Sequence, residues 1–233
     1  MRIFYLLKQD VIFQFRHRFY YAYFFILAVY FSILMNVDGV VKEFLTVFIL
    51  FSDTTVLGFF FVGGLLLLER DQNILQSLFV TPIKLHEYLF SKVLSLTILA
   101  TVASFIIAIS AFGIPKNIFF FTVGVVLSSA FFIFTGITIA VRSKTVNSYF
   151  FNAIVFTMLF FLPLLDFFGV LKSRFFMIFP THGSIVLFKT LFEDVSLFDM
   201  AVSTVSLIFW NAVITVVAYR WFVKYEILKN TKN

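Results

Sequence analysis

Long apolar runs, separated by short charged breaks, dominate the chain from residue 19 onwards. A helix needs roughly 20 apolar residues to cross a bilayer, whereas a membrane barrel strand alternates apolar and polar residues over about ten. Because lipid offers the backbone no hydrogen-bond partners, continuous runs of this length predict helices. The predicted spans are Phe19–Asn36, Phe44–Leu68, Val93–Phe112, Ile118–Val141, Tyr149–Phe168 and Met200–Phe222. The sequence therefore predicts an all-α polytopic membrane protein with six transmembrane helices, in a single domain over residues 1–233.

The composition supports a lipid environment. Charged residues make up 13 % of the chain, against about 25 % in soluble domains, which is too few to coat a soluble globule. The 38 Phe residues have two interpretations: they replace Leu on lipid-facing surfaces, or they line a cavity. The absence of Cys excludes disulfides and thiolate metal sites. His17, His86 and His182 lack the spacing of metal ligands, so no metal site is predicted.

Positive charge is distributed unevenly between the two sides of these spans. With the N-terminus inside, 13 of the 18 Lys and Arg residues fall in segments on the cytoplasmic side and 5 outside. Because Lys and Arg collect on the cytoplasmic side, this predicts that both termini are cytoplasmic. The expected location is the cell membrane, in a bacterium the cytoplasmic membrane. Residues 1–18 mix basic and apolar positions, with Phe4, Leu7, Val11 and Phe15 on one helical face, and are predicted to lie in the interface.

The external connection, residues 169–199, contains two apolar segments that are too short to cross the membrane. They are Phe175–Phe179 and Ile185–Phe192, and their length suits re-entrant or interfacial segments. The sequence Pro180-Thr181-His182-Gly183 between them is predicted to be a turn, with His182 a turn residue and not a ligand. We expect this segment to be re-entrant and to precede the sixth span.

The second and third spans are joined by a long polar stretch, residues 69–92. We expect the charges of Glu69-Arg70-Asp71 to lie in water or among headgroups. The apolar residues between Ile74 and Phe79 recur at helical spacing, which predicts a short amphipathic helix. Thr81-Pro82 is typical of an N-cap followed by proline at the first position of a second helix, which leads back into the bilayer. A helix–turn–helix hairpin is predicted; the alternative is a plain connecting loop.

Asp53 is an acidic residue near the middle of the second span. A charged carboxylate there costs several kcal/mol unless it is paired or faces water. Three alternatives remain open. Asp53 bonds a Ser or Thr of a neighbouring helix, is protonated, or lines a path across the membrane together with Ser52 and Thr54.

Small and amide side chains in the later spans predict helix packing. Gly124 with Ser128, and Gly136 with Ala140, have the four-residue spacing that lets helices approach closely, within the chain or across a dimer. Asn152, like Asn211 in the last span, is expected to bond between helices and not to bind a ligand.

The connection between the second and third spans resembles that of type-2 ABC exporter permeases. In that family an acidic-basic pair ends the second span, and here this pair is Glu69-Arg70. An amphipathic segment follows, here Ile74–Val80, and then a Thr-Pro dipeptide, here Thr81-Pro82. A Tyr-x-x-x-Lys sequence leads into the third span, here Tyr88 with Lys92. Asp53 and Gly58 upstream also fit. The chain is most similar to the fluoroquinolone-export permease group. The likeness is strong over residues 52–92 and elsewhere extends only to topology.

The resemblance implies a division of labour between subunits. It places the hairpin in a cleft of a separate ATP-hydrolysing subunit, and it implies that two membrane domains, identical or different, form one pore. Its implied coupling residues are Glu69, Arg70, Gln72, Gln76, Ser77, Thr81 and Pro82. It also implies an external plug, for which Phe175, Phe176 and Phe179 are the gate candidates.

The motor is expected in a partner. A phosphate-binding loop needs Gly-x-x-x-x-Gly-Lys, but here Gly58 and Gly63 are followed by Gly64 inside a span. No cofactor is therefore expected in this chain, and ATP and Mg²⁺ are expected on the partner ATPase.

The leading function is a non-enzymatic permease for multidrug efflux or export of another amphipathic substrate: a drug, a peptide or a lipid. A secondary transporter is disfavoured because inverted repeats are not apparent. A membrane-embedded enzyme needs clustered acids or His at depth, whereas Asp53 stands alone and Asp166 lies near the outer rim. A non-catalytic assembly or immunity protein is the third alternative.

Overall fold

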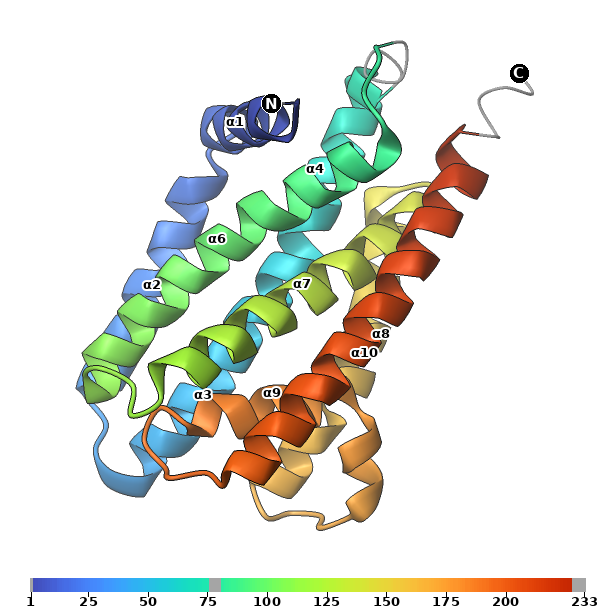
Figure 1. Ribbon diagram of the computed structural model, residues 1–233. Coiled ribbons are helices and arrows are strands. Elements are labelled where there is room, and N and C mark those ends of the chain that lie inside the picture. The colour runs from blue at the N-terminus through green and yellow to red at the C-terminus, as the bar shows by residue number, and fades with distance from the viewer. Residues whose placement is uncertain (1, 76–80, 228–233) are drawn as a thin grey trace.

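A computed structural model describes residues 2–75 and 81–227, and this part of the chain consists of helices joined by short connections, without strands (Figure 1). The predicted all-α class is confirmed. The elements are α1 (Arg2–Arg16), α2 (Phe19–Met35), α3 (Gly39–Val56), the π-helix η1 (Leu57–Phe61), α4 (Val62–Asp71), α6 (Leu85–Phe112), α7 (Ile118–Arg142), α8 (Val146–Phe167), the 3₁₀ helix η2 (Arg174–Ile178), α9 (Pro180–Lys189), α10 (Leu197–Phe222) and the π-helix η3 (Val223–Ile227).

The described residues contain five helices that are long and apolar enough to cross a membrane, or six if α1 and α2 form one broken span. By length and composition they are Gly39–Asp71, Leu85–Phe112, Ile118–Arg142, Val146–Phe167 and Leu197–Ile227. The difference from the predicted six spans lies at α2, which has 17 residues. The chain is thus a multi-pass membrane protein.

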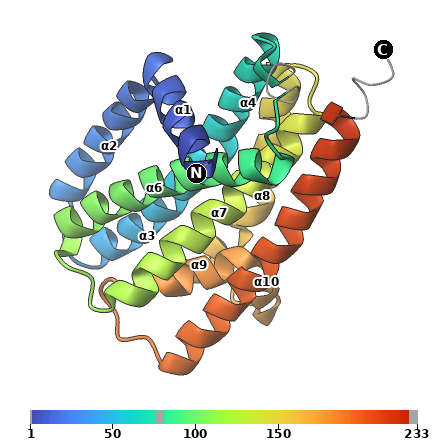
Figure 2. The ribbon, with the colours of Figure 1, turned by 45° about the horizontal axis from the view of Figure 1, so that its top comes forward.

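α1 is bent by 71° from α2, and the backbone turns at Arg18, whose φ is 62°. Figure 2 shows α1 crossing the first turns of α6. Its apolar face is outward, with Phe4 and Phe15 exposed, as an interfacial helix requires. Its inward face is polar: Asp10 and Gln14 are buried there with Leu6. Charged and amide groups therefore pack α1 onto the bundle.

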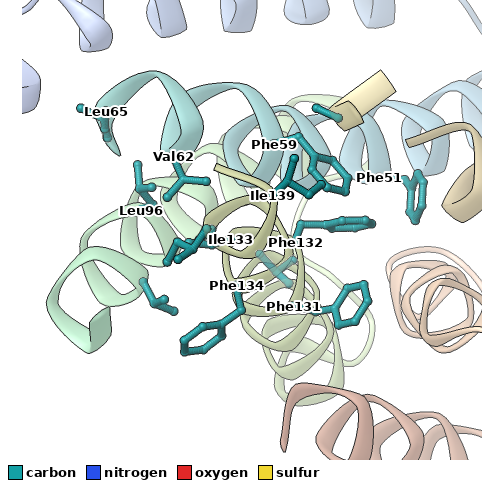
Figure 3. Packing of buried hydrophobic residues seen from close by; sticks show 14 of the residues in the cluster. Phe51, Phe59, Val62, Leu65, Leu96, Phe131, Phe132, Ile133, Phe134 and Ile139 are labelled. Atoms are coloured by element: carbon teal, nitrogen blue, oxygen red, sulfur yellow. The ribbon is translucent and has the colours of Figure 1, made fainter. Parts of the chain in front are cut away.

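The core of the bundle lies between α7 and the continuous helix α3–η1–α4. Phe132 of α7 packs edge-on against Phe51 and Phe59, with ring centroids 5.5 and 5.6 Å apart (Figure 3). The backbones meet closely, because a Cβ added to Gly136 would collide with the carbonyl oxygen of Gly58. The small residues of α7 therefore pack within the chain, which was one of the two predicted alternatives.

Two local predictions were wrong. Pro180 begins helix α9 and Gly183 lies within it, so these residues are not a turn; proline suits the first position of a helix because its φ is already helical. Thr81 and Pro82 do not start the helix after the connection. α6 begins at Leu85, where the Lys84 N–H donates to Glu87 Oε2 at 2.8 Å and so caps the first turn.

The two ends of the bundle differ in content, and we name them by their short helices. At the α1 end lie α1, the described ends of the α4–α6 connection, the last turn of α7 and η3 (Figure 1). At the α9 end lie η2 and α9, a ten-residue helix that packs against α7, α8 and α10. α9 is too short to cross the membrane, as its apolar run predicted.

Candidate functional site

A buried charged cluster at the α1 end joins three helices. The Lys92 side chain of α6 is 1 % exposed, and its Nζ lies 2.8 Å from Asp10 Oδ1 of α1 and 2.5 Å from Glu69 Oε1 of α4. The remaining carboxylate oxygens are also satisfied: Ser91 donates to Asp10 at 2.5 Å and Tyr88 to Glu69 at 2.6 Å. One lysine thus holds two carboxylates out of water.

Glu69 was expected in water or among headgroups, and that expectation was wrong. It is 4 % exposed, and both of its carboxylate oxygens accept hydrogen bonds from α6, from Lys92 and Tyr88, which charge counting along the chain did not reveal. Asp10 was missed as well. The sequence did contain a signal for its burial: Asp10 lies four positions from both Leu6 and Gln14, so the three share one face of a basic amphipathic helix.

Arg70 follows Glu69 but points to a different neighbour, because consecutive helical residues are about 100° apart. Its guanidinium donates to the backbone oxygens of Ser143 (2.7 Å) and Ala140 (3.2 Å) and forms an ion pair with Glu226 of η3. Arg70 therefore ties the end of α4 to the end of α7 and to η3. With Glu69, it links α4 to α1, α6, α7 and η3.

The connection beyond these anchors is accessible at its described ends. Asp71, Gln72, Thr81 and Pro82 are exposed, and Gln72 Nε2 lies 3.4 Å from His17 Nε2. The predicted coupling residues Gln76 and Ser77 lie outside the described residues, as does most of the predicted amphipathic helix. The structure thus places Glu69 and Arg70 in the packed bundle and the neighbouring predicted residues at its surface.

Asp53 bonds a neighbouring helix, although not through the Ser or Thr that was expected. Tyr23 of α2 donates to Asp53 Oδ2 at 2.7 Å, and Oδ1 is buried without a partner among the described residues. The carboxyl group is 1 % exposed, four residues before the π-helix η1. Such π-helical turns are frequent at functional sites.

The other two predicted path residues differ in burial. Thr54 is fully buried, and its hydroxyl donates to Leu50 and Phe51 of its own helix. Ser52 is partly exposed. Asp53 and Thr54 are buried in this structure, so a role of these residues in lining a path stays a prediction.

The predicted gate residues lie at the α9 end, around η2. Phe175 is exposed, Phe176 is 4 % exposed, and the rings of Phe175 and Phe179 are 5.7 Å apart. Behind them, Gly124 of α7 packs on Leu187 of α9, and Ser128 donates to Ser184 at 2.7 Å. The helix α9, which follows the gate candidates, therefore packs closely against α7, and the action of Phe175, Phe176 and Phe179 as a gate stays a prediction.

Comparisons with known proteins agree with this architecture. Residues 1–230 match the model of the fluoroquinolones export permease protein family. Two curated proteins called fluoroquinolones export permease protein, from two strains of Mycobacterium tuberculosis, are each 22 % identical over 192 residues. Those alignments cover 82 % of this chain and 81 % of each relative. A family match over almost the whole chain, together with a helical membrane fold, confirms the resemblance: the chain belongs to the fluoroquinolones export permease protein family.

Proposed function

We propose that the chain is the membrane-spanning permease subunit of an ATP-driven exporter, coupled to a separate ATPase subunit through residues 69–92. The observation that carries this proposal is the ion pair between Glu69 and Lys92, the two ends of that segment. Because Lys92 also pairs with Asp10 of α1, a force on the connection reaches α1, α4 and α6 together.

The exposed residues at the described ends of the connection supply the docking surface. Asp71, Gln72, Thr81 and Pro82 carry no large apolar side chain and are reachable by a partner, while Glu69 and Arg70 transmit motion inward. ATP and Mg²⁺ act on the partner. In this chain Gly58 and Gly63 are buried helical residues against Phe132 and Tyr149, an environment suited to helix packing and not to a nucleotide.

The translocation path is proposed between two permease copies, identical or paralogous, with Asp53, Ser52 and Thr54 on its lining in the open state and Phe175, Phe176 and Phe179 at its external gate. The substrate is an amphipathic molecule. The names of the relatives make fluoroquinolones the first compounds to test, before other drugs, peptides and lipids.

Co-purification and ATPase measurements test the coupling. The permease is expressed with an ATPase subunit encoded beside it, reconstituted in nanodiscs, and assayed with a fluoroquinolone panel. The variant Gln72→Arg/Thr81→Arg changes only exposed side chains and is expected to lose both co-purification and drug-stimulated ATP hydrolysis. Val170→Arg, an exposed position at the α9 end, is the matched control and keeps both. Normal co-purification of the double variant would contradict the proposed docking surface.

A further inference from the structure

A lateral groove at the α1 end of the bundle has no role in the proposed transport cycle. Its floor is one stripe of α7, formed by Thr135, Thr138, Ile139 and Arg142, which recur at helical spacing. Asn152 and Phe156 of α8 form one wall, and Trp221 with the preceding turns of α10 forms the other. The groove has a volume of about 340 Å³, at the lower end of the roughly 300–1,000 Å³ typical of small-molecule sites.

The groove opens between helices that are little buried within the chain. Only 17 % of the most apolar stretch of α8, and the same share of α10, is covered by the rest of the protein. Phe156, on the α8 wall, is 42 % exposed. Where no second copy covers such an opening, its neighbour in a membrane is lipid, and the floor of about 10 Å between Thr135 and Arg142 is long enough for the first part of an acyl chain.

Positive charge is gathered at one end of the groove. The Arg142 guanidinium lies 4.5 Å from the centre of the Trp221 ring and 5.9 Å from that of Tyr225, and Lys224 Nζ lies 5.4 Å from the same Tyr225 ring. Neither cation has an ion pair among the described residues, and no acidic residue lines the groove. Arg142 lines the groove and Lys224 lies beyond its end, both against the Tyr225 ring, and the groove lining contains no acidic residue, so this end attracts an anion.

The groove also contains an amide that makes no hydrogen bond within the described residues. Asn211 donates to the Leu127 carbonyl oxygen at 3.0 Å and so joins α10 to α7, as its sequence position predicted. Asn152, for which the same role was expected, makes no hydrogen bond with the described residues and lines the groove instead. Its side chain is available to a glycerol or ester oxygen.

We propose that this groove binds an anionic phospholipid, with the phosphate at Arg142 and Lys224 and one acyl chain along α7 between α8 and α10. The guanidinium pairs with a phosphate through two parallel N–H donors, and Trp221 and Tyr225 suit the interfacial depth of a headgroup. Basic pockets between membrane helices favour anionic lipids over zwitterionic ones in the same way. The site needs neither the ATPase nor a transported substrate, so it stands apart from the proposed function.

Tryptophan quenching by brominated lipid tests the site directly, because Trp221 lies in the groove. The chain has two Trp residues, and Trp210→Phe leaves Trp221 as the reporter. The variant is placed in nanodiscs of mixed phosphatidylglycerol and phosphatidylcholine, with bromine on the acyl chains of either lipid. We expect brominated phosphatidylglycerol to quench Trp221 fluorescence more strongly than its mole fraction in the lipid mixture predicts. Equal quenching by the two lipids would overturn the proposal, and so would a Trp221 that neither lipid quenches, which would indicate a second copy over the groove.

Charge variants in the Trp210→Phe background complete the test. Arg142→Gln and Lys224→Gln are each expected to reduce the preference for phosphatidylglycerol about fivefold. Arg142→Lys retains most of it, and Arg220→Gln, at an exposed cation of α10 that neither lines the groove nor lies over the Tyr225 ring, leaves it unchanged. The reciprocal Trp221→Phe protein, reporting from Trp210, is expected to show no lipid preference. A preference that survives both Gln substitutions in proteins of parental melting temperature would refute the assignment.

Discussion

At the α1 end of the bundle, charged side chains from three helices meet around Lys92, whereas at the α9 end and along α7 the helices meet through glycine and serine. The first contact depends on charge balance: one lysine compensates two buried carboxylates. The second depends on shape, since added atoms have no room. A contact of charges can exchange partners during a conformational change, whereas a close backbone contact holds two helices as one body.

The comparison also separates moving from static elements in the proposed cycle. α1, α4 and α6 join at the charged cluster, near the segment proposed to receive the ATPase. α7 and α9 join through Gly124 with Leu187 and Ser128 with Ser184. We therefore expect the α1 end to rearrange and the α7–α9 contact to persist. The following predictions test this difference, from the largest effect to the smallest.

Lys92→Met is expected to destabilise the fold by about 3–5 kcal/mol, because it leaves Asp10 and Glu69 buried without a counter-charge. The measurement is the free energy of unfolding in mixed micelles. The triple variant Lys92→Met/Asp10→Asn/Glu69→Gln serves as the control and should recover most of the loss. Parental stability of the single variant would show that the cluster is not the contact that holds this end together.

Gly136→Ala is expected to destabilise the fold by about 1–3 kcal/mol, because its Cβ would collide with the Gly58 carbonyl oxygen. Gly64→Ala is the matched control on the partner helix, where the nearest atom to a new Cβ is 3.6 Å away. Its stability should stay the same or rise slightly, since alanine favours a helix over glycine. Equal effects of the two substitutions would contradict a shape-limited contact at Gly136.

Tyr23→Phe is expected to cost about 1 kcal/mol, because it removes the hydroxyl that satisfies Asp53 Oδ2 in the membrane interior. Tyr21→Phe, at an exposed position of the same helix, should leave the unfolding free energy unchanged. The pair should be compared by thermal melting in one lipid mixture. A neutral Tyr23→Phe would mean that Asp53 gains nothing from α2, and would favour a role for Asp53 in transport alone.

The smallest expected effect is a pH dependence at the α9 end. Burial lowers the pKa of His182, and Lys189 lowers it further, while Asp166 and Asp199 oppose the shift. Since the unfolded chain then binds more protons than the native state, stability should fall as the pH drops below the ordinary histidine pKa of about 6.5 and level off below the native pKa. His182→Gln should remove the pH dependence of the melting temperature between these two pKa values. An unchanged slope would show that His182 does not carry the effect.

Much of this architecture could be predicted from local patterns. α7 begins at Ile118 as predicted, and α8 and α10 differ from the predicted spans by a few residues, because a lipid-exposed helix needs only a long apolar run. The family resemblance was also visible in the sequence, and the comparisons confirmed it. It rested on the motif residues Glu69, Arg70, Thr81, Pro82, Tyr88 and Lys92. Helix ends that depend on capping were predicted less well. The helix after the connection was expected to start at Thr81-Pro82, but α6 starts at Leu85, where Lys84 and Glu87 form the cap. Pro180 begins a helix where a turn was expected.

The sequence by itself determined the helices, their approximate bounds and the family, because hydrophobic length and a short motif are properties of contiguous residues. Only the tertiary structure decided which buried polar groups meet. Asp10 and Lys92 are 82 residues apart, and Tyr23 and Asp53 are 30 apart. Such pairs form because a charge or hydroxyl excluded from water must find a partner on whichever helix packs beside it. Within the described residues, the same packing left Arg142 and Lys224 without an ion pair and Asn152 without a hydrogen bond at or beside one groove, which no single segment could reveal.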